Sequence, residues 1–220
     1  MLLAEDLLLL LTDDETGRLL VTGQYVDVAL AGAQLVQLSL DRRVDVDDRK
    51  RLVVLEPSPT GDPLLDGALA VVAKRAGKKP SAVLGALGKG LRGQLYARLA
   101  AAGVLRSEPG KVLGLFPRTS WPTASAEHES AVRRGLEGPL VHGLTPDPRS
   151  AALVALLHAL RSTHKVVDPK AHDLRRRELD RRAKEIAEGS WGSKAVREAI
   201  DAMLAAVMVA VTASTSASSG

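Results

Sequence analysis

Residues 31–55 read AGAQLVQLSLDRRVDVDDRKRLVVL, and residues 91–115 read LRGQLYARLAAAGVLRSEPGKVLGL. Each stretch begins with apolar residues at helical spacing and ends in short apolar runs separated by a polar turn, the pattern of a helix followed by a β-hairpin. At an offset of 60 residues the two share Gln-Leu, at 34–35 and 94–95, and valine, at 44 and 104. This predicts two similar helix-plus-hairpin units, with chance similarity of short apolar runs as the alternative.

The turns of the two predicted hairpins differ in composition. In the first unit, residues 47–50 are polar and separate two short valine-rich runs. In the second unit, Glu108-Pro109-Gly110 is a stronger turn signal, because proline presets φ and glycine tolerates the conformations that turns need.

The rest of the chain is mostly helical in pattern. Asp62-Pro63 is typical of a helix start, since the carboxylate can cap free amides and proline suits the first turn. We therefore predict a mainly α fold with short β-hairpins: one domain over residues 2–211 that contains two winged-helix-like units, and a disordered tail over 212–220. Helices are expected over residues 2–11, 25–40, 81–87, 91–102, 149–161, 174–188 and 198–211.

Composition sets the class of protein. The chain has 220 residues, 45% of them hydrophobic and only 2% aromatic, so a sizeable core must consist of Leu, Val, Ala and Ile. Cysteine is absent, which excludes disulfides and thiol catalysis. Glu5 and Asp6 stand where a secretory signal would be basic, and the apolar stretch 203–213 is shorter than the roughly 20 residues of a membrane span. The expected location is cytoplasmic.

Motifs for catalysis are missing. Residues 88–93, GKGLRG, match a dinucleotide-binding glycine pattern, but neither a preceding strand nor an acidic residue about 20 positions on accompanies it. His158, His164 and His172 lack the spacing of zinc ligands. We expect no enzyme activity, no cofactor and no metal.

Charge is unevenly distributed. Residues 67–107 contain eight Lys and Arg and no Asp or Glu, a single-sign segment that attracts anions unless acids from elsewhere balance it. In the helix predicted over 91–102, Leu91, Leu95 and Leu99 share the inward face. Lys89 and Arg92 then lie near the helix start, where two cations and free amides form a candidate phosphate-binding site. The alternative is that both side chains are simply solvated.

Several short motifs, in their order and spacing, resemble the Golgi phosphoprotein 3 family over nearly the whole chain. They are the N-terminal Leu-rich segment followed by Asp and Glu before Gly17, the sequence SPTGD at 58–62 with LLD at 64–66, and Gly103-Val104-Leu105. The resemblance implies a mainly helical single domain. It also implies a peripheral membrane protein that binds phosphatidylinositol 4-phosphate and links cargo proteins to coat machinery.

The family's lipid pocket uses a tryptophan, an arginine and two further arginines. Along this sequence the last two fall on Lys89 and Arg92, so both charges are kept, although lysine lacks the two-pronged grip of arginine. The tryptophan falls on Thr22 and the first arginine on Ala31. Affinity for anionic lipid is therefore expected to carry over better than selectivity for one phosphoinositide.

The family's hairpin, at about residues 107–119, is implicated in self-association and membrane contact. An exposed apolar strand edge invites pairing with a second copy or with lipid. The hairpin residues that we expect to serve this role are Val112, Leu113, Leu115 and Phe116.

The leading hypothesis is thus a peripheral protein of anionic phospholipid membranes. A winged-helix nucleic-acid-binding protein is the first alternative, but nucleic acid is disfavoured as a partner because only Gln94 on the candidate reading helix suits base-edge readout. The second alternative is an oligomeric scaffold or adaptor. The Ala- and Arg-rich composition is typical of a GC-rich bacterial genome, in which case the family's trafficking role does not transfer.

Overall fold

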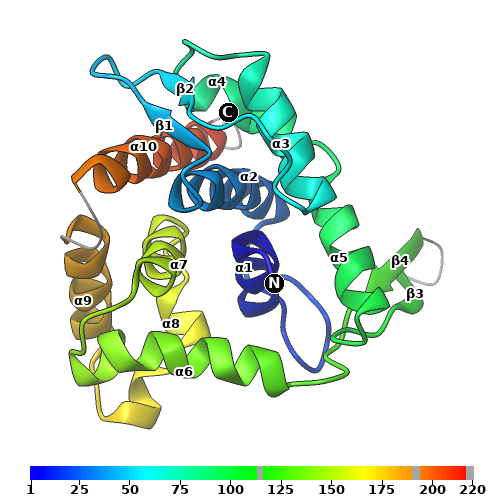
Figure 1. Ribbon diagram of the computed structural model, residues 1–220. Helices are drawn as coiled ribbons and strands as arrows, with labels where there is room; N and C mark the ends of the chain where they lie inside the picture. Colours follow the sequence, from blue (N-terminus) through cyan, green and yellow to red (C-terminus); the bar gives the residue numbers. More distant parts are fainter. Residues whose placement is uncertain (113–115, 190–193, 217–220) are drawn as a thin grey trace.

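The computed structural model describes residues 1–112, 116–189 and 194–216 and has a mainly helical fold, as predicted (Figure 1). Helices α1 (Leu3–Leu10) and α2 (Gly23–Leu40) lie in the middle of the molecule. Every residue of α1 is buried, and α2 packs against α1, α4 (Ser81–Gly88), α7 (Pro148–Ala159) and α10 (Lys194–Ser216). A helix that is apolar on nearly all sides is stable in water only when other elements cover it. The leucine- and alanine-rich helices α1 and α2 therefore lie in the core.

The predicted helix boundaries hold closely for the helices at residues 81–88, 148–159 and 176–188, whereas the helices at residues 127–142, 163–166 and 169–172 were not predicted. Asp62 caps α3 (Pro63–Ala73): its Oδ1 accepts from the amides of Leu64 at 2.9 Å and Leu65 at 3.3 Å, which confirms the predicted start. The remaining helices are α5 (Leu91–Ala101), α6 (Glu127–His142), α8 (Thr163–Val166), the short 3₁₀ helix η1 (Pro169–His172) and α9 (Arg176–Glu188).

The first hairpin forms as expected. Strand β1 (Val44–Val46) pairs antiparallel with β2 (Leu52–Val54), with Val44 opposite Val54 and the polar turn between them. Helix α2 followed by this hairpin is the first helix-plus-hairpin unit.

The second hairpin is displaced from its predicted register. Strand β3 (Glu108–Val112) pairs with β4 (Phe116–Ser120), so Glu108-Pro109-Gly110 lies in a strand and the prediction of a turn there is wrong. Pro109 is tolerated opposite Thr119 because a two-stranded ribbon has a free edge on which a missing amide breaks no pairing. The repeat at 60 residues therefore holds for the order of the elements but not for the strand register.

Helix α10 is longer than predicted. It runs to Ser216, so the expectation of a disordered tail from Thr212 is wrong for residues 212–216; residues 217–220 lie outside the described part. The Thr212 hydroxyl donates to the carbonyls of Met208 and Val209, both at 3.0 Å, so this polar group is satisfied within the helix itself. Among the described residues, no helix combines the length and the hydropathy that a membrane crossing requires.

Candidate anion-binding site

The candidate site lies where α4 ends and α5 begins. α4 stops at Gly88, where a Cβ would approach the carbonyl oxygen of Asp27 to 3.2 Å and the Cβ of Ala31 to 3.7 Å. Glycine thus lets α4 rest directly on α2. Gly90 has φ of +71°, a left-handed conformation that glycine adopts without strain, and it turns the chain into α5. Leu91, Leu95 and Leu99 are buried as predicted, which fixes the face of α5 that points inward.

Arg92 reaches the first turns of α2. Its Nε lies 3.3 Å from Oδ1 of Asp27, and its Nη1 lies 2.4 Å from where a Cβ on Gly23 would be, so the absence of a side chain at Gly23 makes room for the guanidinium. Both charged side chains of the ion pair keep about a third of their surface exposed. Burial raises the pKa of Asp27, while the charge of Arg92 opposes that rise. Arg92 is therefore partly accessible but already shares its charge with a carboxylate.

Lys89 has different surroundings. Its side chain is exposed and lines a shallow hollow of about 180 Å³ together with residues of α2, α3 and α5, among them Gln34, Leu64 and Gln94. The two predicted cations thus lie three residues apart at one corner of the molecule. Arg92 points toward the start of α2, and Lys89 borders the hollow toward α3.

The two departures from the family pattern lie at the same corner. Thr22 is the exposed N-cap residue of α2, directly before Gly23, and its side chain makes no capping hydrogen bond. Ala31 is fully buried beneath the end of α4. The position of the first family arginine therefore contributes no cation here, because it holds an alanine, whose side chain is covered by α4.

The prediction that residues 67–107 present unbalanced positive charge is wrong for three of the eight cations, all of them arginines. Arg98 forms the strongest ion pairs: its Nε lies 3.0 Å from Glu5 Oε1 and its Nη1 lies 2.8 Å from Asp62 Oδ2. Arg92 pairs with Asp27, and Arg106 lies 3.8 Å from Glu108. Acids remote in sequence therefore balance these side chains, the alternative that the charge pattern left open.

The lysines behave differently from the arginines. In residues 1–112, 116–189 and 194–216, no ion pair is formed by Lys74, Lys78, Lys79 or Lys89, and all four are exposed. Both arginines of α5 are held by carboxylates of α1, of α2 and of the N-cap of α3, which lowers the net charge at this helix.

The predicted hairpin residues are only partly within the described chain. Val112 and Phe116 pair with each other at the ends of β3 and β4, whereas Leu113 and Leu115 lie outside the described residues. Figure 1 shows the β3–β4 hairpin projecting beside α5, away from the central helices.

The sequence patterns did not reveal what holds the base of this hairpin. Trp121 stacks on Tyr96 with ring centroids 4.9 Å apart and nearly parallel planes, and the Tyr96 hydroxyl hydrogen-bonds to that of Thr12 at 2.9 Å. At Gly17, with φ of +61°, a Cβ would lie 2.1 Å from the Trp121 amide nitrogen. Because the chain has only five aromatic residues, the sequence alone could have suggested that two of them, such as Tyr96 and Trp121, pack together.

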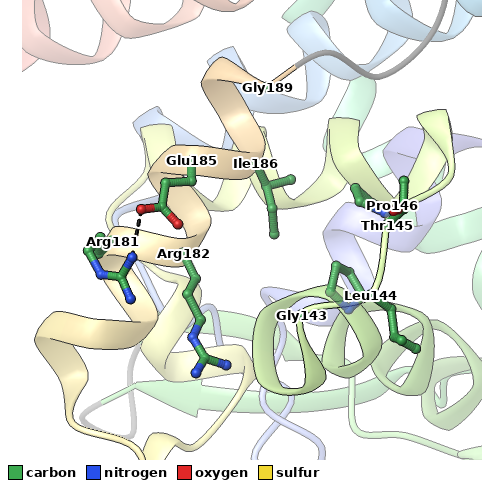
Figure 2. Close-up of a pocket in the computed structure, with 10 residues that line it drawn as sticks. Gly143, Leu144, Thr145, Pro146, Arg181, Arg182, Glu185, Ile186 and Gly189 are labelled. Atoms are coloured by element: carbon green, nitrogen blue, oxygen red, sulfur yellow. Dashed lines mark hydrogen bonds and ion pairs between the residues drawn. The ribbon is translucent and has the colours of Figure 1, made fainter.

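A second hollow, of about 450 Å³, lies between the end of α6, residues 143–146 and α9 (Figure 2). Its cations serve the fold: Arg182 donates to the carbonyl oxygens of Leu140 and Val141, at 3.1 and 2.5 Å, and Arg181 pairs with Glu185 at 2.7 Å. Arg182 thus caps the last carbonyls of α6. Among the described residues, no group of three or more acids and histidines is placed to hold a metal ion.

Taken together, the fold defines a mainly helical protein built on two helix-plus-hairpin units, with a partly paired basic corner between them. Residues 3–203 match the family model of Golgi phosphoprotein 3 (GPP34), and the chain belongs to this family. No curated protein matched the sequence.

Proposed function

We propose that this chain is a peripheral membrane protein, and not an enzyme, that binds anionic phospholipid headgroups at the corner of α2, α4 and α5. Phosphatidylinositol 4-phosphate is the ligand proposed from the family. The observation that carries the proposal is the family match over residues 3–203. By the resemblance described above, two of the three arginine positions of the family's lipid pocket correspond to Lys89 and Arg92.

The geometry of the corner supports a phosphate ligand. Lys89 is exposed, and the Arg92 guanidinium is a third exposed, so both can meet a phosphate that approaches from solvent. The first amides of α2, at Gly23 and Gln24, precede any intrahelical partner, and the positive end of the helix dipole adds to the attraction. Asp27 opposes binding, because a phosphate must compete with it for Arg92.

Because Asp27 competes with a phosphate for Arg92, charge changes at this corner should lower vesicle binding in some variants and raise it in another. Lys89→Glu, alone and with Arg92→Gln, should lower sedimentation with vesicles containing phosphatidylinositol 4-phosphate, whereas Asp27→Asn should raise it. Each charge near an anionic bilayer contributes on the order of 1 kcal/mol, so Lys89→Glu is expected to lower the partition coefficient at least about fivefold and the double variant at least about thirtyfold. Asp27→Asn, which removes one negative charge, is expected to raise the partition coefficient roughly fivefold.

The matched control for Lys89→Glu with Arg92→Gln is Lys170→Glu with Arg134→Gln, which changes the net charge by the same amount. Both residues are exposed and lie on α6 and η1, outside the corner. Unchanged circular dichroism and melting temperature verify the fold of each variant. If Lys89→Glu with Arg92→Gln binds these vesicles as well as the parent protein, the proposed headgroup site is wrong.

The proposal extends to the β3–β4 hairpin as the site of self-association or membrane contact. Phe116→Asp is expected to abolish a discrete oligomer in sedimentation velocity, or to weaken vesicle binding where the parent protein is monomeric. If it changes neither property, the hairpin has neither role.

A further inference from the structure

The first hairpin and the loop before α4 form one surface. The Leu52 amide donates to the Lys78 carbonyl at 2.8 Å, and the Gly77 amide donates to the Leu52 carbonyl at 2.8 Å. Arg51 also reaches the Gly77 carbonyl, at 3.5 Å. These bonds hold the turn at residues 47–51 against the loop at residues 74–80, two segments that are distant in sequence.

Cations dominate this surface, and α10 borders it. We define the polybasic groove as residues 47–51, 74–81 and 201–209, which carry seven Lys and Arg against three Asp, a net charge of +4. All seven cations are exposed: Arg49, Lys50, Arg51, Lys74, Arg75, Lys78 and Lys79. One of the three acids, Asp47, accepts the backbone amides of Arg49 and Arg51 and so serves the turn itself.

The floor of the groove is apolar. A hollow of about 700 Å³ lies between Arg49 and Lys79 on one side and α10 on the other, with Ala202, Ala205 and Val209 among its lining residues and Asp201 near one end. Val209 is 63% exposed and its neighbour Met208 is 40% exposed. Exposed aliphatic side chains beside a cluster of lysines and arginines are the pattern of a surface that lies on a lipid bilayer, where cations meet phosphates and aliphatic groups enter the acyl boundary.

Nucleic acid fits the groove less well. Proteins that hold single strands stack bases on aromatic rings, and the three segments of the groove contain no Phe, Trp or Tyr. An aliphatic floor gives a phosphate backbone no partner, whereas it suits acyl chains.

We infer that the polybasic groove is a second membrane contact, which docks on the surface of an anionic phospholipid bilayer through charge and Val209 without selecting one headgroup. This inference rests on the proposed function, because it presumes that the protein meets a membrane. The two sites are separate. The groove includes Ser81, the first residue of α4, whereas Lys89 follows Gly88, the last residue of α4. Eight helical residues place these two ends of α4 about 12 Å apart.

A fluorescent label tests the contact directly. Because the chain has no cysteine, Val209→Cys and Leu144→Cys each give one site for an environment-sensitive dye, at positions of nearly equal exposure, 63% and 62%. We expect a blue shift at position 209 with phosphatidylcholine vesicles that contain phosphatidylglycerol, and none at position 144. A shift at 144 without one at 209 would overturn the inference.

Charge reversal provides the second arm. Lys78→Glu with Lys79→Glu should lower the partition onto the same vesicles at least thirtyfold, since two charges near the surface are lost. The control pair, Arg134→Glu with Lys170→Glu, makes the same change in net charge on α6 and η1, and α6 lies at the far end of the molecule in Figure 1. It should bind like the parent protein.

The variants at the two sites separate the two proposals. If Lys78→Glu with Lys79→Glu binds like the parent while Lys89→Glu weakens binding, the groove is refuted and the headgroup site stands. The reverse result supports the groove and refutes the headgroup site. If single-stranded nucleic acid binds at physiological salt, vesicles do not, and the Lys78/Lys79 variant loses that binding, the groove is a nucleic-acid surface instead.

Discussion

Buried carboxylates connect the central helix α1 to its surroundings. Glu5 and Asp6 are almost fully buried, and each meets side chains from distant segments: Glu5 pairs with Arg98, and Asp6 pairs with Arg149 at 2.5 Å and shares a hydrogen bond of 2.8 Å with Nε2 of His128. An isolated buried carboxylate is costly, whereas a paired and hydrogen-bonded one is tolerated. These contacts therefore fix how α5, α6 and α7 pack around α1.

A third buried acid, Glu129, makes stability depend on pH. Burial raises its pKa to about 7, a hydrogen bond with Asp14 adds to the rise, and Arg133, which contacts both carboxylates, opposes it. The folded state thus holds this proton more tightly than the unfolded chain does. Its contribution to stability is complete below about pH 4.5 and is lost as the pH rises through 7.

We predict that Glu129→Gln removes this pH dependence. The amide keeps an acceptor for Arg133 and carries no charge, so above pH 7 the variant should be more stable than the parent protein by on the order of 2 kcal/mol. At pH 4.5 the two should be nearly equal. Urea unfolding at both pH values measures the difference, and His158 and His164, whose pKa burial lowers, titrate alike in both proteins. A constant difference across this range would contradict the assignment.

Helices α2 and α10 approach each other closely at Gly32. A Cβ on Gly32 would lie 2.3 Å from a methyl group of Val207, so these two helices approach over a glycine. Gly67, in α3, is the opposite case, because a Cβ there would meet nothing within 4 Å.

Gly32→Ala and Gly67→Ala should therefore change stability in opposite directions. Overpacking costs about 1–3 kcal/mol, which outweighs the gain of up to about 1 kcal/mol in helix propensity, so Gly32→Ala is expected to destabilise the protein. Gly67→Ala has only the gain and should stabilise it by about 0.5–1 kcal/mol. Thermal and urea unfolding would show this, and a stabilising Gly32→Ala would mean that α10 does not pack on α2 in this way.

The whole molecule is completed by its last helix. α10 packs on α2, α4, α7 and β1, and it buries Met203, Leu204 and Val207. Each of these side chains contributes about 1.5–3 kcal/mol, so their sum is comparable with the total stability of a typical domain.

Deletion of residues 194–220 should therefore abolish cooperative unfolding. We expect the truncated protein to keep helical circular dichroism, to bind a hydrophobic dye and to lose its sharp thermal transition, because the apolar surface of α2 and α7 is uncovered. Deletion of residues 217–220 alone is the control and should have no effect. A truncated protein that still melts cooperatively would show that α1, α2 and α7 form a sufficient core.

The sequence by itself determined most of the elements and half of the site. Apolar segments located α1, α2, α4, α5 and α7, a charged segment located α9, Asp62-Pro63 marked the start of α3, and short motifs indicated the family. These signals are local, since a helical period or a cap depends on residues within a few positions. The positions of Lys89 and Arg92 beside the start of α5 could be predicted in the same way.

Only the tertiary structure decided which charges are free. Arg98 is paired with Glu5, 93 positions away, and the turn at 47–51 lies on the loop at 74–80, and neither fact follows from a local pattern. Helix α6 was not predicted, because Gly135, Gly138 and Pro139 obscure its helical period. The strand at Pro109-Gly110 was not predicted either, because these residue types are typical of a turn. Pairing of charges and strands depends on long-range distances that only the folded chain creates. In residues 67–107 these distances pair Arg92, Arg98 and Arg106 with carboxylates and leave Lys74, Lys78, Lys79 and Lys89 exposed.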